Sequence, residues 1–288
     1  MPGGEAAGRL AAALAPLVGP YLARQRWFAG PGDEVTQVGV VAAEVIVPGP
    51  PGLLWALVAA RGATYQLLVG LRPEDDAAAL LHGQEAATVG PVPESETVAY
   101  DALVDPELAM VVLDIVTAGA ERAERVRPVG GEQSNSSLIY DDRVILKVFR
   151  RVQPGPNPDV EVALALDGVG FNHVAAPLGH WRREDLDLDL GHAQEFLHGG
   201  TEGWALALTS LRDLYARAGA SSPRPGPGGG DEAPGPEAAA TAGGDFGAEA
   251  RRLGETTAKL HMAMARAFGT GPGRPGAWAE DVGGQVGA

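Results

Sequence analysis

The chain has no cysteine, few aromatic residues and many fewer basic than acidic residues. The absence of cysteine excludes disulfides and cysteine-ligated metal sites, and it is typical of proteins of the reducing cytoplasm, where we expect this one. Lysine and arginine together number 22 against 37 aspartates and glutamates, which gives a formal net charge of −15 at pH 7. This surplus argues against a nucleic-acid or anionic-membrane partner, whereas a local phosphate site remains compatible with it.

The sequence also lacks an unbroken apolar run long enough for a membrane-spanning helix, which needs about 18 residues. Residues 10–23 are apolar, but Glu5 accompanies Arg9 before them, so the positively charged start of a signal peptide is missing. We predict an amphipathic helix here, with a signal peptide as the alternative. The helix is indicated by apolar residues that recur on one face, namely Leu10, Leu14, Leu17, Val18, Tyr21 and Leu22.

The most informative stretch is residues 126–151. Its pattern predicts a strand, a loop of glycines and polar residues, a second strand, a two-residue turn at Asp141 and Asp142, and a third strand. The third strand is apolar and β-branched apart from Lys147. Because an unpaired buried ammonium is unfavourable, we expect Lys147 to face a cleft that holds an anionic group.

A helix that begins near Asn157 carries Glu161 in its first turn. In kinase-like folds, a loop of small residues, a lysine on a strand and a glutamate on a helix follow one another in this order. There the loop covers the phosphates of ATP, the lysine contacts them and the glutamate orients the lysine. Taken singly, each feature has a structural explanation: an edge-strand lysine that blocks aggregation, a solvated helix glutamate and a hairpin loop. Their order favours the kinase interpretation.

Three segments carry a resemblance to a known family. They are the Gly-Gly-Glu-Gln-Ser-Asn block at 130–135, the strand at 146–151 and the segment at 154–161. They resemble bacterial maltokinases and the related actinobacterial glucosamine kinases. Arg26 to Gly30 resembles the start of that family's N-terminal cap, although Pro31 replaces an expected basic residue. Residues 194–204 resemble its hinge.

The resemblance implies an α+β protein that uses ATP and Mg²⁺ to phosphorylate a sugar, either maltose or glucosamine. It implies that Lys147 positions phosphates, that Glu161 holds Lys147, and that the backbone of Glu195 and Leu197 in a hinge at 193–197 binds adenine. It also implies a loop that covers the nucleotide, formed by Gln133, Ser134, Asn135 and Ser136.

The order of these features predicts three domains: a cap at residues 1–120, a kinase-like N-lobe at 121–197, and the start of a helical C-lobe at 198–288. We expect three antiparallel strands in the cap, at 35–47, 53–60 and 64–71, and short helices after them. In the third domain we expect helices at 206–218 and 246–268. Residues 219–244 between them are rich in Gly, Pro and Ala, so we predict a flexible, protease-sensitive insertion.

Residues 185–190 alternate aspartate and leucine. Three carboxylates at this spacing suggest a metal site, but strand alternation would place all three on one face of a sheet. Because a charged face of this kind is usually solvated, we predict a strand with a solvated acidic face and no metal ligands.

A kinase of this type also needs a catalytic aspartate in a His-x-Asp loop and further metal ligands. After the hinge, the aspartates are Asp213, Asp231, Asp245 and Asp281, and none has a histidine two residues before it. We therefore expect the front portion of a longer kinase, without its catalytic base, metal ligands and sugar pocket. The alternatives are a non-catalytic nucleotide-binding or interaction module, a remnant of a gene, or a phosphotransferase of the aminoglycoside type.

Overall fold

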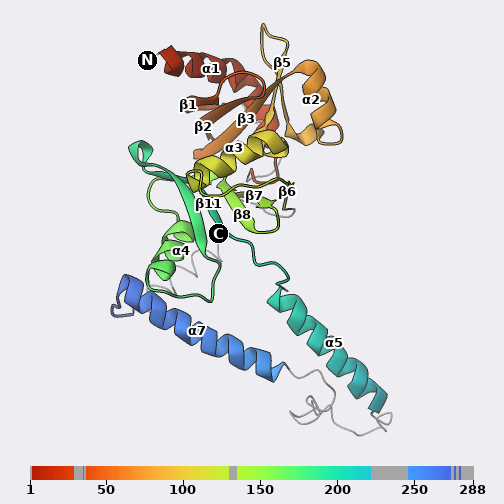
Figure 1. The fold of residues 1–288 in the computed structure, drawn as a ribbon, viewed down its shortest axis with the longest axis vertical. Helices are drawn as coiled ribbons and strands as arrows, with labels where there is room; N and C mark the ends of the chain where they lie inside the picture. Colours follow the sequence, from red (N-terminus) through yellow and green to blue (C-terminus); the bar gives the residue numbers. More distant parts are fainter. Residues whose placement is uncertain are drawn as a thin grey trace. The chain divides into compact units, whose positions relative to one another are not determined.

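The structure is a computed structural model, and it describes residues 2–28, 35, 37–129, 135–200, 202–221, 246–273, 276 and 279. The chain forms two compact units, Met1–Leu164 with Val174–His198, and Ala165–His173 with Gly199–Ala288. Figure 1 shows their elements. The architecture mixes helices with two antiparallel sheets, which confirms the predicted α+β class. Residue 120 lies inside the first unit, in the segment between a helix and the second sheet.

The first sheet is the antiparallel module that the strand pattern predicted. Its strand order is β1-β2-β3-β5-β4, and a short sixth strand, β9, pairs with β3. Turns at positive φ, such as Arg61 and Gly62 between β2 and β3, allow the chain to reverse within two residues. The bounds are β1 Gly39–Val47, β2 Gly52–Ala60, β3 Ala63–Pro73, β4 Thr88–Pro91, β5 Thr97–Asp101 and β9 Arg151–Val152.

The first helix, α1 (Pro2–Ala23), covers one face of this sheet. Its predicted apolar stripe is confirmed, since Leu14, Val18, Tyr21 and Leu22 are all buried. They form one core with sheet residues such as Leu54 and Leu67. The amphipathic spacing therefore identified the correct helix and the correct buried face.

The second sheet has the order β10-β11-β8-β7-β6, also antiparallel. Between β7 and β8 the chain turns at Asp141 (φ 48°) and Asp142 (φ 53°), which confirms the predicted turn, although Arg143 also belongs to the loop because Tyr140 pairs with Val144. Two successive left-handed residues are typical of hairpin turns, and aspartate tolerates that conformation. The bounds are β6 Val126–Pro128, β7 Asn135–Tyr140, β8 Val144–Phe149, β10 Pro177–Arg183 and β11 Leu188–Glu195.

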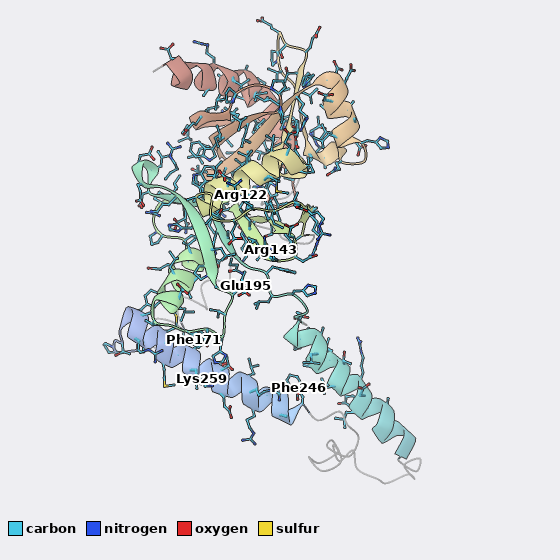
Figure 2. The ribbon with its side chains drawn as sticks, in the orientation of Figure 1. Arg122, Arg143, Phe171, Glu195, Phe246 and Lys259 are labelled. Carbon is cyan, nitrogen blue, oxygen red and sulfur yellow. The ribbon has the colours of Figure 1, made fainter. Side chains whose placement is uncertain are left out.

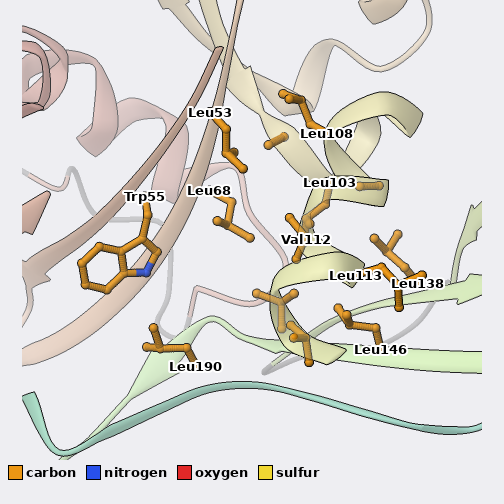
Figure 3. Packing of buried hydrophobic residues seen from close by; sticks show 14 of the residues in the cluster. Leu53, Trp55, Leu68, Leu103, Leu108, Val112, Leu113, Leu138, Leu146 and Leu190 are labelled. Atoms are coloured by element: carbon orange, nitrogen blue, oxygen red, sulfur yellow. The ribbon is translucent and has the colours of Figure 1, made fainter. Parts of the chain in front are cut away.

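Helix α3 (Pro106–Thr117) lies against the second sheet and joins its core to that of the first. Asp105 caps its start by accepting the Glu107 N–H (3.0 Å), and Pro106 occupies its first turn, where the missing N–H has no cost. Figure 3 shows its buried face, Leu108, Val112 and Leu113, among leucines of both sheets.

Gln66, which is fully buried on β3, connects the two sheets. Its amide donates to the carbonyls of Phe149 (3.0 Å) and Leu190 (2.8 Å), and its oxygen accepts the indole N–H of Trp55 (2.9 Å). A buried amide with these partners satisfied fixes the sheets in one arrangement.

The remaining helices match the predicted segments in their general position. The first unit contains α2 and three short 3₁₀ helices, while α4 crosses from the first unit into the second. Most of the predicted insertion at 219–244 lies outside the described residues. No helix in the described ranges is both long and apolar enough to span a bilayer. The bounds are α2 Glu74–Leu81, η1 Glu85–Ala87, η2 Ala102–Val104, α4 Pro158–Gly168, η3 Glu184–Leu186, α5 Gly203–Ser221 and α7 Gly247–Phe268.

One strand prediction was wrong in extent. The alternating segment 185–190 is not one continuous strand, because η3 ends at Leu186, Asp187 is in the left-handed region (φ 53°) and β11 starts only at Leu188. Asp189 is buried there and accepts from Arg182 Nη1 (3.0 Å), so the predicted solvated face does not form.

Candidate nucleotide site

Lys147 lies in the middle of β8, between strands β7 and β11. Its neighbours Leu146 and Val148 are fully buried, whereas the Lys147 side chain keeps 27% of its surface exposed. Strand alternation explains the difference, because Leu146 and Val148 point into the core and Lys147 points to the other face. The lysine is therefore a central-strand residue rather than one on an exposed edge.

The partner of Lys147 is Asp159, whose Oδ2 lies 3.2 Å from the Lys147 Nζ. The prediction that Glu161 forms this ion pair was wrong, since the ion pairs of the described residues join Lys147 to Asp159 only. Residues two apart on a helix point about 200° from each other, so one turn cannot present both carboxylates to the same lysine. Glu161 is exposed to solvent in the first turn of α4.

Polar contacts hold the start of α4 in position. The Asn157 side-chain oxygen accepts the N–H of Asp159 (2.9 Å), which is the capping interaction that a helix start needs. The N–H of Asn157 in turn donates to the buried Asp189 Oδ2 (2.6 Å). Asp189, which the sequence suggested only as part of an acidic face, therefore helps to place Asp159 beside Lys147.

His192 pairs with Lys147 across the β8–β11 ladder and is buried. Burial, and next the charge of Lys147, lower the pKa of His192 from its usual value near 6.5. The imidazole is thus neutral at pH 7 and adds no second positive charge beside the lysine. Its Nε2 has no hydrogen-bond partner among the described residues.

The structure describes only two of the four predicted loop residues. Gln133 and Ser134 lie outside the described residues. Asn135 begins β7 and lines a cleft of about 430 Å³ that Asp159 and Asp189 also line. Ser136 faces the other way, because its hydroxyl accepts from the Nε of Arg150 (2.8 Å).

The predicted hinge at 193–197 includes the last residues of β11, among them Glu195, which Figure 2 labels. The N–H of Glu195 donates to the carbonyl of Ala176 (2.9 Å), and the N–H of Phe196 donates to the carbonyl of Arg143 (2.7 Å). The Glu195 N–H is therefore already used within the protein. Leu197 is more than half exposed, and its N–H has no recorded acceptor among the described residues.

Residues 21–105 match the model of the maltokinase N-terminal cap domain. A glucosamine kinase from Mycolicibacterium smegmatis is 28% identical over 102 residues, which are 34% of this chain and 26% of that enzyme. The chain resembles the N-terminal part of maltokinases and glucosamine kinases. This finding agrees with the resemblance that the motifs indicated.

Solved structures extend the similarity at the level of the fold. One crystal form of glucosamine kinase gives a TM-score of 0.50 at 17% identity, and the match covers 88% of this chain and 52% of that one. A second crystal form gives 0.44 at 19% identity, with 88% and 51% covered. The chain therefore spans about half of the length of that kinase, and the first match shows a kinase-like fold.

Proposed function

We propose that this chain binds ATP at the exposed face of β8, as the nucleotide-binding part of a sugar kinase. The observation that carries the proposal is the Lys147–Asp159 pair. It is a lysine in an apolar central strand, partly exposed and held by a carboxylate from the first turn of the next helix, and that carboxylate lines a polar cleft. An ammonium kept charged and oriented in this way is suited to phosphate oxygens.

Each residue would have a separate task. Lys147 would contact phosphate oxygens, and Asp159 would hold the lysine extended, the task that we first predicted for Glu161. The polar side chain of Asn135 lies on the cleft at the start of β7. In the hinge, the carbonyl of Glu195 and the N–H of Leu197 would bind adenine, because the Glu195 N–H already donates to Ala176.

Mg²⁺ is the ion that such a nucleotide carries, and it neutralises phosphate charge when it is bound. Within the described part of the chain, no group of three or more histidine or carboxylate side chains is placed to hold a metal ion. Asp189, the buried carboxylate on the cleft, is already committed to Arg182 and Asn157. These described residues therefore do not fit a dedicated metal site.

The acceptor that we propose for the complete reaction is a sugar hydroxyl, on glucosamine or maltose. The support is the match of residues 21–105 to the maltokinase cap together with the similarity to glucosamine kinase. With purified chain, ATP, Mg²⁺ and either sugar, we expect no sugar phosphate, because the sequence after the hinge contains no His-x-Asp motif. Turnover that disappears in Lys147→Ala would contradict this expectation.

Nucleotide binding can be tested by calorimetric titration of the chain with ADP and ATP. We expect Lys147→Ala to weaken binding about tenfold or more, and Asp159→Asn to weaken it less, since a charge-assisted contact contributes about 1.5–3 kcal/mol. The sequence provides a matched control in Lys259, the other lysine of the chain, which is exposed on α7 (Figure 2). Equal affinity of the wild type and Lys147→Ala would overturn the proposal.

A further inference from the structure

A second cavity in the first unit is not explained by nucleotide binding. It has a volume of about 380 Å³, within the range of small-molecule sites. Its walls come from the segment after α1, from η1 and η2, and from the start of β7. Trp27, Leu103, Val104 and Leu138 make much of the lining apolar. A ligand in this cavity would therefore bury an apolar portion.

The charge of the cavity is opposite to that of the chain. Arg24, Arg26 and Arg150 line it, and the one carboxylate among its described lining residues is that of Asp101. In a protein with a net charge of −15, three arginines around one hollow form a local positive field. Arg26 is exposed, and no ion pair joins it to another described residue. It is thus available to an anion that enters.

Arg150 is the buried charge of this cavity, with 1% of its surface exposed. Its Nη2 lies 2.5 Å from Asp101 Oδ2, its Nε donates to Ser136, and its guanidinium lies 4.9 Å from the centre of the Trp27 ring. Its Nη1 is buried and has no acceptor in the described structure. An acceptor placed in the cavity would satisfy this N–H after a small shift of the side chain.

The Arg150 side of the cavity lies on the opposite face of β7 from Lys147, although Ser137 also lines the cavity. Ser137 pairs with Lys147 across the β7–β8 ladder, so its side chain shares the face of the lysine. Ser136 and Leu138 alternate to the other face, where Ser136 meets Arg150. Lys147 is not among the residues that line the cavity. Asn135 lines both this cavity and the cleft beside Asp159, but the three arginines and the apolar wall residues line the cavity and not that cleft. The two sites therefore use separate binding groups.

We propose that this cavity binds a small organic anion, a carboxylate or phosphate group on a flat apolar body. The apolar body packs against Trp27, Leu103 and Val104, and the anionic group meets Arg26 first and the charge of Arg150 beneath it. Recognition needs both parts, because the apolar wall gives no preference for charge and the arginines alone would hold any anion weakly.

The test uses phenyl phosphate as the probe, and inorganic phosphate and phenol represent its two halves. Calorimetry or ligand-observed NMR measures the binding of each compound. We expect phenyl phosphate to bind the full chain at least about tenfold more tightly than either half. Saturating ADP and the change Lys147→Ala should leave its affinity unaltered. Loss of binding in Lys147→Ala, or displacement by ADP, would place the probe at the nucleotide site and overturn the proposal.

Two variants and one control variant locate the probe. Arg26→Ala removes an exposed side chain, so the fold is retained, and it should weaken phenyl phosphate about fivefold or more. Arg122→Ala makes the same change of charge at another exposed position (Figure 2) and should leave the affinity unchanged. Val104→Glu adds a negative charge to the wall and should abolish binding. The melting temperature of this variant shows whether the fold is retained. Equal losses in Arg26→Ala and Arg122→Ala would show a general charge effect and refute the assignment.

Discussion

Helices α3 and α7 differ in how far their apolar side chains are buried. The shorter one, α3, buries Leu108, Val112, Leu113 and Val116 between two sheets. The longer one, α7, buries Ala263 alone among its described side chains. Both are amphipathic in sequence. The difference shows that helical periodicity predicts which face is apolar, whereas burial depends on whether another surface packs on that face.

The second unit also exposes large side chains that the first unit would bury. Trp204 and Tyr215 on α5 are each 69% exposed, and Leu253 on α7 is 63% exposed. In the first unit, Trp55 and Tyr100 are almost completely inaccessible. Substitutions should therefore have large effects in the first unit and small ones in α5 and α7, and the following predictions test that contrast.

The largest effect is expected from Leu113→Ala in α3. Removal of a fully buried leucine side chain should lower the free energy of unfolding by about 2–5 kcal/mol, because transfer energy and a cavity term add. The matched change Leu253→Ala on α7 should alter it by less than about 0.5 kcal/mol. Denaturant unfolding followed by circular dichroism measures both, and similar losses would contradict the contrast.

Gln66→Leu should follow, with a loss of about 2–4 kcal/mol. Leucine has a similar size, but it leaves the Trp55 N–H and the carbonyls of Phe149 and Leu190 buried without this partner. Gln37→Leu, at an exposed position, is the control and should be nearly neutral. If Gln66→Leu proved as stable as the wild type, the amide would not be what joins the sheets.

The sequence predicted most of the fold because local signals were strong. The adjacent residues Asp141 and Asp142, which are both left-handed in the structure, indicated a hairpin turn. Apolar runs separated by Gly and Pro indicated β1 to β3. It did not reveal Gln66, since a single polar residue within an apolar strand has the same pattern whether it is solvated or buried. Its role depends on Phe149 and Leu190, which are distant in sequence.

The candidate site was predictable to within two residues. The position of Lys147 followed from its apolar strand, but the choice between Asp159 and Glu161 depends on where the first turn of α4 begins. The alternating aspartates were misinterpreted because one left-handed residue, Asp187, interrupts the strand. Arg150 was missed, because a basic residue at the end of a strand usually reaches solvent, whereas here Asp101 and Trp27 bury it.

Asp105→Asn tests the electrostatics of the first unit. Burial would raise the pKa of Asp105, but hydrogen bonds from Arg72 and Tyr100 outweigh burial and lower it. A carboxyl with a lowered pKa stabilises the fold above its unfolded value of about 3.9, and this contribution is lost as the pH falls through the folded pKa.

We therefore expect Asp105→Asn to lower the free energy of unfolding by about 1–3 kcal/mol at pH 7 and by progressively less below pH 4. Unfolding curves at a series of pH values measure this trend. Asp114→Asn, on the exposed side of α3, is the matched control and should change the free energy of unfolding by less than about 0.5 kcal/mol at pH 7. A loss that stays constant into acid would mean that the ionised form of Asp105 is not what stabilises α3.

The smallest predicted effect is a gain. Ala118 ends α3 in the left-handed region (φ 50°), where its N–H still bonds to the carbonyl of Ile115 (3.3 Å), and its side chain is exposed. An L-residue is strained in that conformation and glycine is not, so Ala118→Gly should raise the free energy of unfolding by about 0.5–1 kcal/mol. In the middle of α7, Ala258→Gly should instead reduce helix content, because glycine is unfavourable in a helix by about 1 kcal/mol. Thermal unfolding of the first variant and far-UV circular dichroism of the second measure these changes. Destabilisation by Ala118→Gly would show that residue 118 does not end α3 in the left-handed conformation.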